Sequence, residues 1–330
     1  MNCMQDISEI RKNLWEIRSE EEFCRIALDL FHFQYDHVPV YKEFCDQLGR
    51  SNPKTLEEIP FLPIEFFKTQ KILTSGKKEE LIFKSSGTTG SIRSHHYVTD
   101  LSLYEESFMH CFEQFFGKVQ GKVILALLPN YLEQGNSSLV YMVDYLIRAS
   151  ENERSGFFLY NHEELLRVIE QAKKAGEDVI LFGVSYALLD LAEKRINLEG
   201  VRIIETGGMK GRRKEMIKEE LHRVLCEGLG VETISSEYGM TELLSQAYSF
   251  RDGVFSLPPW MKVRIRDTED PLSWMEQGRT GGISVIDLAN IYSCSFIHTQ
   301  DLGKIVEGGF RIMGRFDNSD IRGCNLLVNN

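Results

Sequence analysis

The chain has 330 residues, 42% of them hydrophobic, which is enough to bury the core of one large domain. Its formal net charge of −11 and its pI near 5.3 exclude a generally basic surface of the kind that binds nucleic acid or anionic membranes. The N-terminus has no signal-peptide pattern, no apolar run reaches the roughly eighteen residues of a membrane span, and the seven cysteines form no CxxC pair. We therefore expect a cytoplasmic protein with reduced thiols, no nucleic-acid partner and no integral membrane segment.

The first part of the chain is predicted to be helical. Ser19 and Glu22 have the spacing of a capping box, and apolar residues follow at helical spacing as far as Phe31. Segments 38–41 and 59–64 hold three of the eight prolines, which predicts irregular structure lined by apolar side chains. We therefore predict an N-terminal helical extension, residues 1–75, that packs on the rest of the chain.

A loop rich in glycine and hydroxyl side chains follows the apolar residues 81–83. Residues 84–91 read Lys-Ser-Ser-Gly-Thr-Thr-Gly-Ser, and Arg93 lies just beyond them. The glycines allow a close backbone approach and the hydroxyls donate hydrogen bonds, so this segment suits an oxyanion such as a polyphosphate. It lacks the spacing of a Walker loop or a dinucleotide fingerprint, and an ordinary surface turn is the alternative from these residues alone. His95 and His96, soon after the loop, are expected on a strand that leaves it.

Strands and helices alternate in the middle of the chain. Short apolar or β-branched runs at 123–128, 179–184 and 201–204 are separated by helical stretches such as 161–175 and 185–196. This order predicts a parallel sheet. Because ligands bind beyond the carboxyl ends of such strands, the residues that follow each strand are the first candidates for a site.

Two polar segments follow strands of this predicted sheet. Residues 205–214 contain Gly-Gly and four cations, which predicts a glycine turn opening a basic helix with an anion nearby. Residues 235–242, after a predicted strand at 231–234, offer an aromatic ring, a hydroxyl and a carboxylate within Tyr-Gly-Met-Thr-Glu. These groups suit a base, a phosphate and Mg²⁺, although a tight turn and a solvated first helical turn are the plain structural alternatives.

Together, four motifs in order make the chain resemble the adenylate-forming superfamily. Residues 85–90 are similar to its phosphate loop, and 238–242 to its Tyr-Gly-x-Thr-Glu motif. Residues 298–303 resemble the segment whose aspartate binds the ribose. The segments 314–317 and 322–325 resemble its hinge, closest to the phenylacetate-CoA ligase form.

The resemblance implies an α/β fold with parallel sheets flanked by helices. The expected core spans residues 76–313, and residues 314–330 form a truncated hinge and a short tail. Because the chain stops seven residues after Gly323, we expect that the small C-terminal lid domain and its catalytic lysine are lacking. Ile92 and Arg93 stand where the superfamily's loop usually has proline and lysine. The positive charge is kept, but on a planar guanidinium instead of an ammonium group.

Nearly the whole chain resembles the acyl-protein synthetases of the bacterial bioluminescence fatty-acid reductase. That family implies activation of a carboxylic acid, in its case a fatty acid, as the acyl-adenylate. The acyl group then moves to a cysteine near the C-terminus and from there to a reductase. Cys324 is the candidate for this cysteine, and Arg322 could lower the pKa of its thiol, although a packed apolar cysteine is the alternative. Cys294, inside an apolar stretch, is expected in the core.

The resemblance also implies ATP and Mg²⁺ as cofactors, with one role for each motif residue. The predicted phosphate-binding residues are Ser86, Gly87, Thr88, Thr89, Gly90 and Arg93. The predicted adenosine contacts are Gly207 and Gly208 at the adenine, Tyr238 stacked on it, Gly239 in the same motif and Asp301 at the ribose. The predicted reaction centre consists of Thr241 at the α-phosphate, Glu242 on Mg²⁺, Arg315 on the other side of the nucleotide and Cys324 as the acyl acceptor.

Two other functions stay open from the sequence. The chain could be a phenylacetate-type CoA ligase that works without a lid, or a degenerate module that binds nucleotide or acyl groups and serves as a scaffold. The expected partners are a carboxylic acid and an acyl-accepting reductase or carrier protein. The sequence does not identify the acid.

Overall fold

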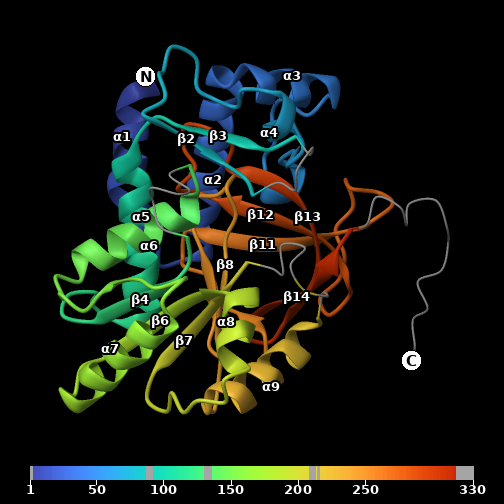
Figure 1. The fold of residues 1–330 in the computed structure, drawn as a ribbon. Coiled ribbons are helices and arrows are strands. Elements are labelled where there is room, and N and C mark those ends of the chain that lie inside the picture. Colours follow the sequence, from blue (N-terminus) through green and yellow to red (C-terminus); the bar gives the residue numbers. More distant parts are fainter. Residues whose placement is uncertain (1–2, 87–91, 130–135, 208–212, 214–215, 317–330) are drawn as a thin grey trace.

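The computed structural model describes residues 3–86, 92–129, 136–207, 213 and 216–316. These residues form a mixed α/β fold with two six-stranded sheets and a separate two-stranded hairpin (Figure 1). One hydrophobic core contains side chains from the N-terminal helices and from both sheets. The division into segments 1–75, 76–313 and 314–330 stays a prediction. No helix in the described ranges is long and apolar enough to cross a bilayer.

The N-terminal part is helical, and its capping box is confirmed. Ser19 accepts a hydrogen bond from the Glu22 amide, and the Glu22 side chain bonds back to the cap, as predicted. Segment 38–41 was predicted to be irregular, which is wrong: a helix begins at Pro39, whose fixed φ and missing N–H suit a first helical position. The elements are α1 (Cys3–Asn13), η1 (Leu14–Glu16), α2 (Glu20–His37), α3 (Pro39–Gln47), η2 (Leu56–Glu58), β1 (Leu62–Pro63) and α4 (Phe66–Thr69).

The first large sheet has the order β5-β4-β6-β7-β8-β9 and is parallel except for its last pair. Every residue of β4 and β6 is buried, as expected for strands covered on both faces, and α6, α7 and α8 pack against them (Figure 1). The three predicted strands are confirmed. The elements are α5 (Leu101–Phe116), β4 (Val123–Leu127), α6 (Ser138–Ala149), β5 (Gly156–Phe157), α7 (His162–Lys174), β6 (Val179–Val184), α8 (Ser185–Ala192), β7 (Arg202–Thr206), α9 (Lys218–Leu229), β8 (Ser235–Tyr238) and β9 (Ala247–Ser249).

One predicted strand lies elsewhere. The strand expected at 231–234 is instead β8, which begins at Ser235 and pairs with β7 and β9. The polar residues of β8 can occupy a buried strand because neighbouring side chains satisfy them. For example, Ser236 is hydrogen-bonded to Glu205 and His222. The predicted motif at 235–242 therefore starts inside the strand.

The second large sheet is antiparallel, which differs from the expectation of parallel sheets alone. Its order is β10-β14-β13-β12-β11, and only β1 joins it in parallel, beside β13. Short turns replace helical crossovers: β13 and β14 are joined at residues 307–308, where Gly308 has φ +82°. The elements are β10 (Val254–Phe255), β11 (Met261–Arg266), β12 (Gly281–Asp287), β13 (Phe296–Val306) and β14 (Gly309–Arg315).

A small two-stranded hairpin flanks the predicted phosphate loop. Strands β2 (Leu81–Lys84) and β3 (His95–Val98) pair antiparallel on either side of the predicted phosphate loop. The prediction that His95 and His96 lie on a strand leaving the loop is confirmed. At the base of the loop, the Ser85 amide donates to the Ser94 carbonyl at 3.1 Å, and the Ser94 amide donates to Ser85 Oγ at 2.9 Å.

Candidate active site

Three predicted site residues from distant parts of the chain meet beside the carboxyl end of β8. The Tyr238 hydroxyl donates to Asp301 Oδ2 at 2.9 Å, and Arg315 Nε donates to Asp301 Oδ1 at 2.9 Å. Asp301 lies on β13 and Arg315 ends β14, so the antiparallel sheet brings its carboxylate and guanidinium to the edge of the parallel sheet. The Asp301 carboxylate raises the pKa of Arg315, which therefore stays charged.

The three side chains differ in exposure. Tyr238 is buried, with its ring packed against Phe255 and Phe310, while its hydroxyl is held by Asp301. The side chain of Arg315 is 77% exposed, so most of its guanidinium donors face outward. The stacking of Tyr238 on an adenine and the ribose contact of Asp301 stay predictions.

The segment after β8 carries the predicted phosphate and metal residues. Thr241 is partly buried and Glu242 is only 4% exposed. Burial raises the pKa of the Glu242 carboxyl, whereas a hydrogen bond with the Ser94 side chain and the charges of Arg315 and Lys68 act to lower it. Because these interactions offset the cost of burying the Glu242 charge only in part, a bound cation would stabilise the ionised carboxylate.

The residues present fit Mg²⁺ only in company with phosphates. The described residues contain no group of three or more His, Cys, Asp or Glu side chains that could hold a metal by themselves. Mg²⁺ is usually bound through one or two carboxylates, substrate phosphates and water. Glu242 is one such carboxylate, so the donor set suits a metal that arrives with a nucleotide.

Gly239 and Gly207 have separate structural reasons to be glycine. A Cβ on Gly239 would lie 2.2 Å from Glu237 Oε1, so a side chain would displace that carboxyl. Gly207 is exposed, has φ +70°, and accepts a hydrogen bond from Ser185 Oγ at 2.9 Å. Whether either glycine contacts a nucleotide stays a prediction.

Two carboxyl groups at the ends of β7 and β8 were missed as site residues, although both stood inside the quoted motifs. Glu205 is buried and accepts hydrogen bonds from Ser185 Oγ at 2.5 Å and Lys218 Nζ at 2.7 Å. Burial alone would raise its pKa, but the Lys218 ammonium and these bonds hold the pKa at about 2. For Glu205, the signal that could have found it is an acidic residue at the end of the apolar strand β7.

The pKa of the second carboxyl, Glu237, is shifted in the opposite direction. Glu237 is hydrogen-bonded to the Thr206 hydroxyl, and it lies opposite Tyr248 in the pairing of β8 with β9. Burial and the nearby Glu205 charge raise the pKa of Glu237 to about 7, against the Thr206 bond and the Lys218 charge, which lower it. The carboxyl edge of this sheet therefore holds one ionised carboxylate and one that titrates near neutral pH.

The remaining predictions have mixed outcomes. Ser86 and Arg93 are exposed at the two sides of the loop, and Cys294 is buried in the core as expected. The helix predicted at the basic run lies outside the described residues apart from Arg213, which pairs with Asp190 and Glu193, and α9 begins at Lys218. The predicted site residues outside the described ranges are Gly87, Thr88, Thr89, Gly90, Gly208 and Cys324.

The sequence matches one protein family over almost its whole length. The model of the acyl-protein synthetase family LuxE matches residues 13–330. The long-chain-fatty-acid–luciferin-component ligase of Aliivibrio fischeri is 23% identical over 328 residues, covering 89% of this chain and 82% of that protein. The ligase of the same name from Photorhabdus luminescens is 35% identical over 68 residues, covering 20% of this chain and 59% of its own.

Solved structures of adenylate-forming enzymes share the fold. The 2-hydroxyisobutyryl-CoA ligase, solved with 2-HIB-AMP and CoA, superposes with a TM-score of 0.67 at 12% identity, covering 91% of this chain and 70% of that one. ATP-bound MatB from Rhodopseudomonas palustris gives a TM-score of 0.54 at 20% identity over 71% of this chain. This chain covers 47% of MatB, about half of its length. At these identities the likeness concerns the fold.

Proposed function

Because this chain belongs to the LuxE acyl-protein synthetase family, we propose that it activates a carboxylic acid with ATP and transfers the acyl group to a cysteine thiol. The observation that carries the proposal is the cluster of Tyr238, Asp301 and Arg315 beside the Thr241-Glu242 segment. Asp301 offers a carboxylate for ribose hydroxyl groups, and Arg315 offers an exposed guanidinium for phosphate. Glu242 adds a second carboxylate, which suits a metal ion. A long-chain fatty acid is the first candidate substrate, since the Aliivibrio fischeri relative carries that acid in its name.

In the proposed nucleotide site, Asp301 binds the ribose hydroxyls and Tyr238 lies against the adenine. Tyr238 also holds the Asp301 carboxylate in a fixed orientation through its 2.9 Å hydrogen bond. Gly207 and Gly208 let the base approach the backbone, and Gly239 leaves room next to it. These roles make positioning the main contribution of the protein to the first step.

In the proposed phosphate site, the chain neutralises charge around the α-phosphate that the acid's carboxylate attacks. Ser86, Gly87, Thr88, Thr89 and Gly90, with Arg93 beside them, form the proposed cradle for the β- and γ-phosphates. Thr241 donates to the α-phosphate, Arg315 binds from the other side, and Glu242 holds Mg²⁺. When bound, Mg²⁺ supplies positive charge to the phosphate oxygens.

In the proposed second step, the Cys324 thiolate attacks the acyl carbonyl of the mixed anhydride. A carbon–sulfur bond forms, the bond between the carbonyl carbon and the phosphate oxygen breaks, and AMP leaves. The thioester then passes to an acyl-accepting reductase or carrier protein.

A CoA ligase is the second candidate function. It is favoured by the likeness over most of this chain to an enzyme that is named as a CoA ligase and was solved with CoA. In that case an external thiol takes the place of Cys324.

The test is acid-dependent release of pyrophosphate from ATP and Mg²⁺ across fatty, aryl and amino acids, with intact-mass analysis of wild type and Cys324→Ala. We expect release with a fatty acid and an acyl adduct that is absent from the variant. The buried Cys294 makes Cys294→Ser a matched control, which should keep the adduct provided it folds. Release without any adduct would favour CoA or a carrier protein, and binding of ATP without release with any acid would contradict the ligase function.

A further inference from the structure

A buried histidine connects the strand after the phosphate loop to the Thr241-Glu242 segment. His96, on β3, is 1% exposed, and its Nδ1 lies 2.8 Å from the Thr241 carbonyl oxygen. Its Nε2 lies 3.2 Å from Asn290 Oδ1. The imidazole on β3 thus contacts Thr241, 145 residues away in sequence, and Asn290, 194 residues away.

Asn290 continues this bridge. Its Nδ2 donates to the Glu242 carbonyl at 2.9 Å and to the Cys294 carbonyl at 2.9 Å. Both amide hydrogens are therefore committed to carbonyl groups, which fixes the orientation of the amide and turns Oδ1 toward His96. Asn290 is only 1% exposed, so water cannot readily replace these partners.

The two side chains hold the main-chain carbonyls of the two residues assigned above to phosphate and metal. Neither needs to touch a ligand to affect the geometry, because a shifted carbonyl moves the whole peptide unit and the side chain next to it. Ser94, the residue just before β3, closes the base of the loop and is hydrogen-bonded to the Glu242 carboxyl. Ser94 and His96, at the start of the segment that leaves the loop, therefore both contact the Thr241-Glu242 segment.

We propose that His96 is a positioning residue for adenylation, which donates from Nδ1 to the Thr241 carbonyl and, with Asn290, fixes Thr241 and Glu242 relative to strand β3. This inference rests on the proposed function.

The surroundings of the ring determine which nitrogen carries the proton. Both nitrogens face acceptors, but burial lowers the pKa of His96 to about 4, against the contacts with Thr241 and Asn290, which raise it. At neutral pH the ring is therefore uncharged and has one N–H. The shorter contact, 2.8 Å against 3.2 Å, assigns that proton to Nδ1, so the contact of Nε2 with Asn290 Oδ1 is a packing contact and not a second hydrogen bond.

This assignment separates two conservative variants. In His96→Asn the amide nitrogen can occupy the position of Nδ1 and keep the bond to Thr241. In His96→Gln the amide lies at the position of Nε2 and loses that bond. His95→Ala is the matched control, because His95 is the preceding residue on β3 and its side chain points to the other side of the hairpin.

The experiment measures kcat and KM for ATP in pyrophosphate release, together with the melting temperature, for wild type and these variants. We expect His96→Gln to lower kcat by about 10- to 100-fold, whereas His96→Asn stays within about threefold of wild type and His95→Ala is unchanged. Equal losses in the Asn and Gln variants, or a loss that only follows the melting temperature, would overturn the inference. If the variants do not fold, ¹⁵N NMR of the wild-type histidines decides, since an Nε2–H tautomer of His96 contradicts the proposal.

A wild type that releases no pyrophosphate with any acid would count against the proposed function and not yet against this inference. The same variants are then compared by calorimetry with Mg²⁺ and a non-hydrolysable ATP analogue. Weaker binding by His96→Gln than by His96→Asn would support the positioning role. Equal affinities, or no binding by the wild type, would overturn it.

Discussion

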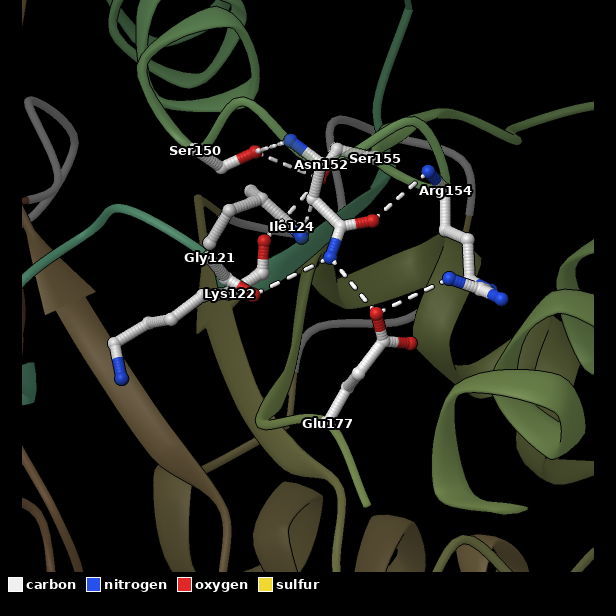
Figure 2. A network of polar contacts seen from close by, with 8 residues as sticks. All are labelled: Gly121, Lys122, Ile124, Ser150, Asn152, Arg154, Ser155 and Glu177. Carbon is white, nitrogen blue, oxygen red and sulfur yellow. Dashed lines mark hydrogen bonds and ion pairs between the residues drawn. The ribbon is translucent and has the colours of Figure 1, made fainter. Parts of the chain in front are cut away.

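The two edges of the parallel sheet are both polar, but they use polar groups differently. At the amino edge, Asn152 donates to the Gly121 carbonyl at 3.2 Å and to Glu177 Oε1 at 3.1 Å, and Arg154 shares the same carboxylate oxygen (Figure 2). Ser155 Oγ accepts from the Ile124 amide at 2.9 Å. Two of these contacts join side chains to the backbone and two join side chains to Glu177, where β4, β5 and β6 begin.

At the carboxyl edge, the contacts are made to buried carboxyl groups: Glu205 accepts from Lys218, Ser185 and Ser236, and Glu237 accepts from Thr206. Glu205 and Glu237 end neighbouring strands, yet the pKa of one is about 2 and that of the other about 7. Such buried charges are costly to maintain and rarely increase stability over an apolar replacement. The comparison teaches that the amino edge is built for stability, whereas the carboxyl edge keeps charges where parallel sheets bind ligands.

The largest expected effect is on chemistry at the carboxyl edge. Glu242→Gln should lower acid-dependent pyrophosphate release by about 10²- to 10³-fold, because it removes the proposed metal ligand. Stability should not fall, since burial raises the pKa of this carboxyl and a neutral amide is easier to bury. The matched variant at the amino edge, Glu177→Gln, should keep kcat within about twofold. Steady-state assays on both variants check this, and an equal loss would remove the functional contrast between the edges.

The next effect is on stability. Lys218→Met leaves the buried Glu205 carboxylate without its 2.7 Å partner and should cost about 3–5 kcal/mol in urea unfolding. Arg154→Met, which breaks the ion pair with Glu177, should cost less than about 1 kcal/mol because the arginine side chain is 40% exposed. Adding Glu205→Gln to Lys218→Met should restore much of the loss. A small cost for Lys218→Met would mean that water reaches Glu205 easily.

The pH dependence of stability should also differ between the two carboxyls. The folded pKa of Glu237, about 7, is above its ordinary value of 4.5, so its contribution is complete below pH 4.5 and is lost as the pH rises through 7. Glu237→Gln should therefore reduce the loss of unfolding free energy between pH 6 and 8, by about 1–2 kcal/mol. Glu205 has a folded pKa of about 2, so its contribution is lost only as the pH falls below 4.5. Glu205→Gln should leave the slope between pH 6 and 8 unchanged, and urea titrations at both pH values test the pair.

The smallest effect on activity is expected at the amino edge. Asn152→Ala should cost about 1–2 kcal/mol, because it removes hydrogen bonds to Gly121 and Glu177, and should leave kcat unchanged. Ser185→Ala is the comparison at the other edge: its hydroxyl contacts both Glu205 and the Gly207 carbonyl. We expect a similar loss of stability there, but with a raised KM for ATP. Identical kinetics in the two variants would contradict a nucleotide contact at Gly207.

The sequence by itself determined the features that depend on neighbouring residues. The capping box at Ser19 and the strands β4, β6 and β7 follow from local spacing and apolar runs, so they could be read from the sequence. The family could also be recognised, because its motifs are short and keep their order along the chain.

Only the tertiary structure decided how distant residues meet. The strand at 235–238 has no apolar run, since its serines are satisfied by Glu205 and His222 from other elements. Likewise, no local pattern predicts that His96 meets Asn290, 194 residues away, or that the antiparallel sheet brings Asp301 to Tyr238. The physical reason is that a buried polar group can take any partner that the fold brings within about 3 Å, whatever its distance along the chain.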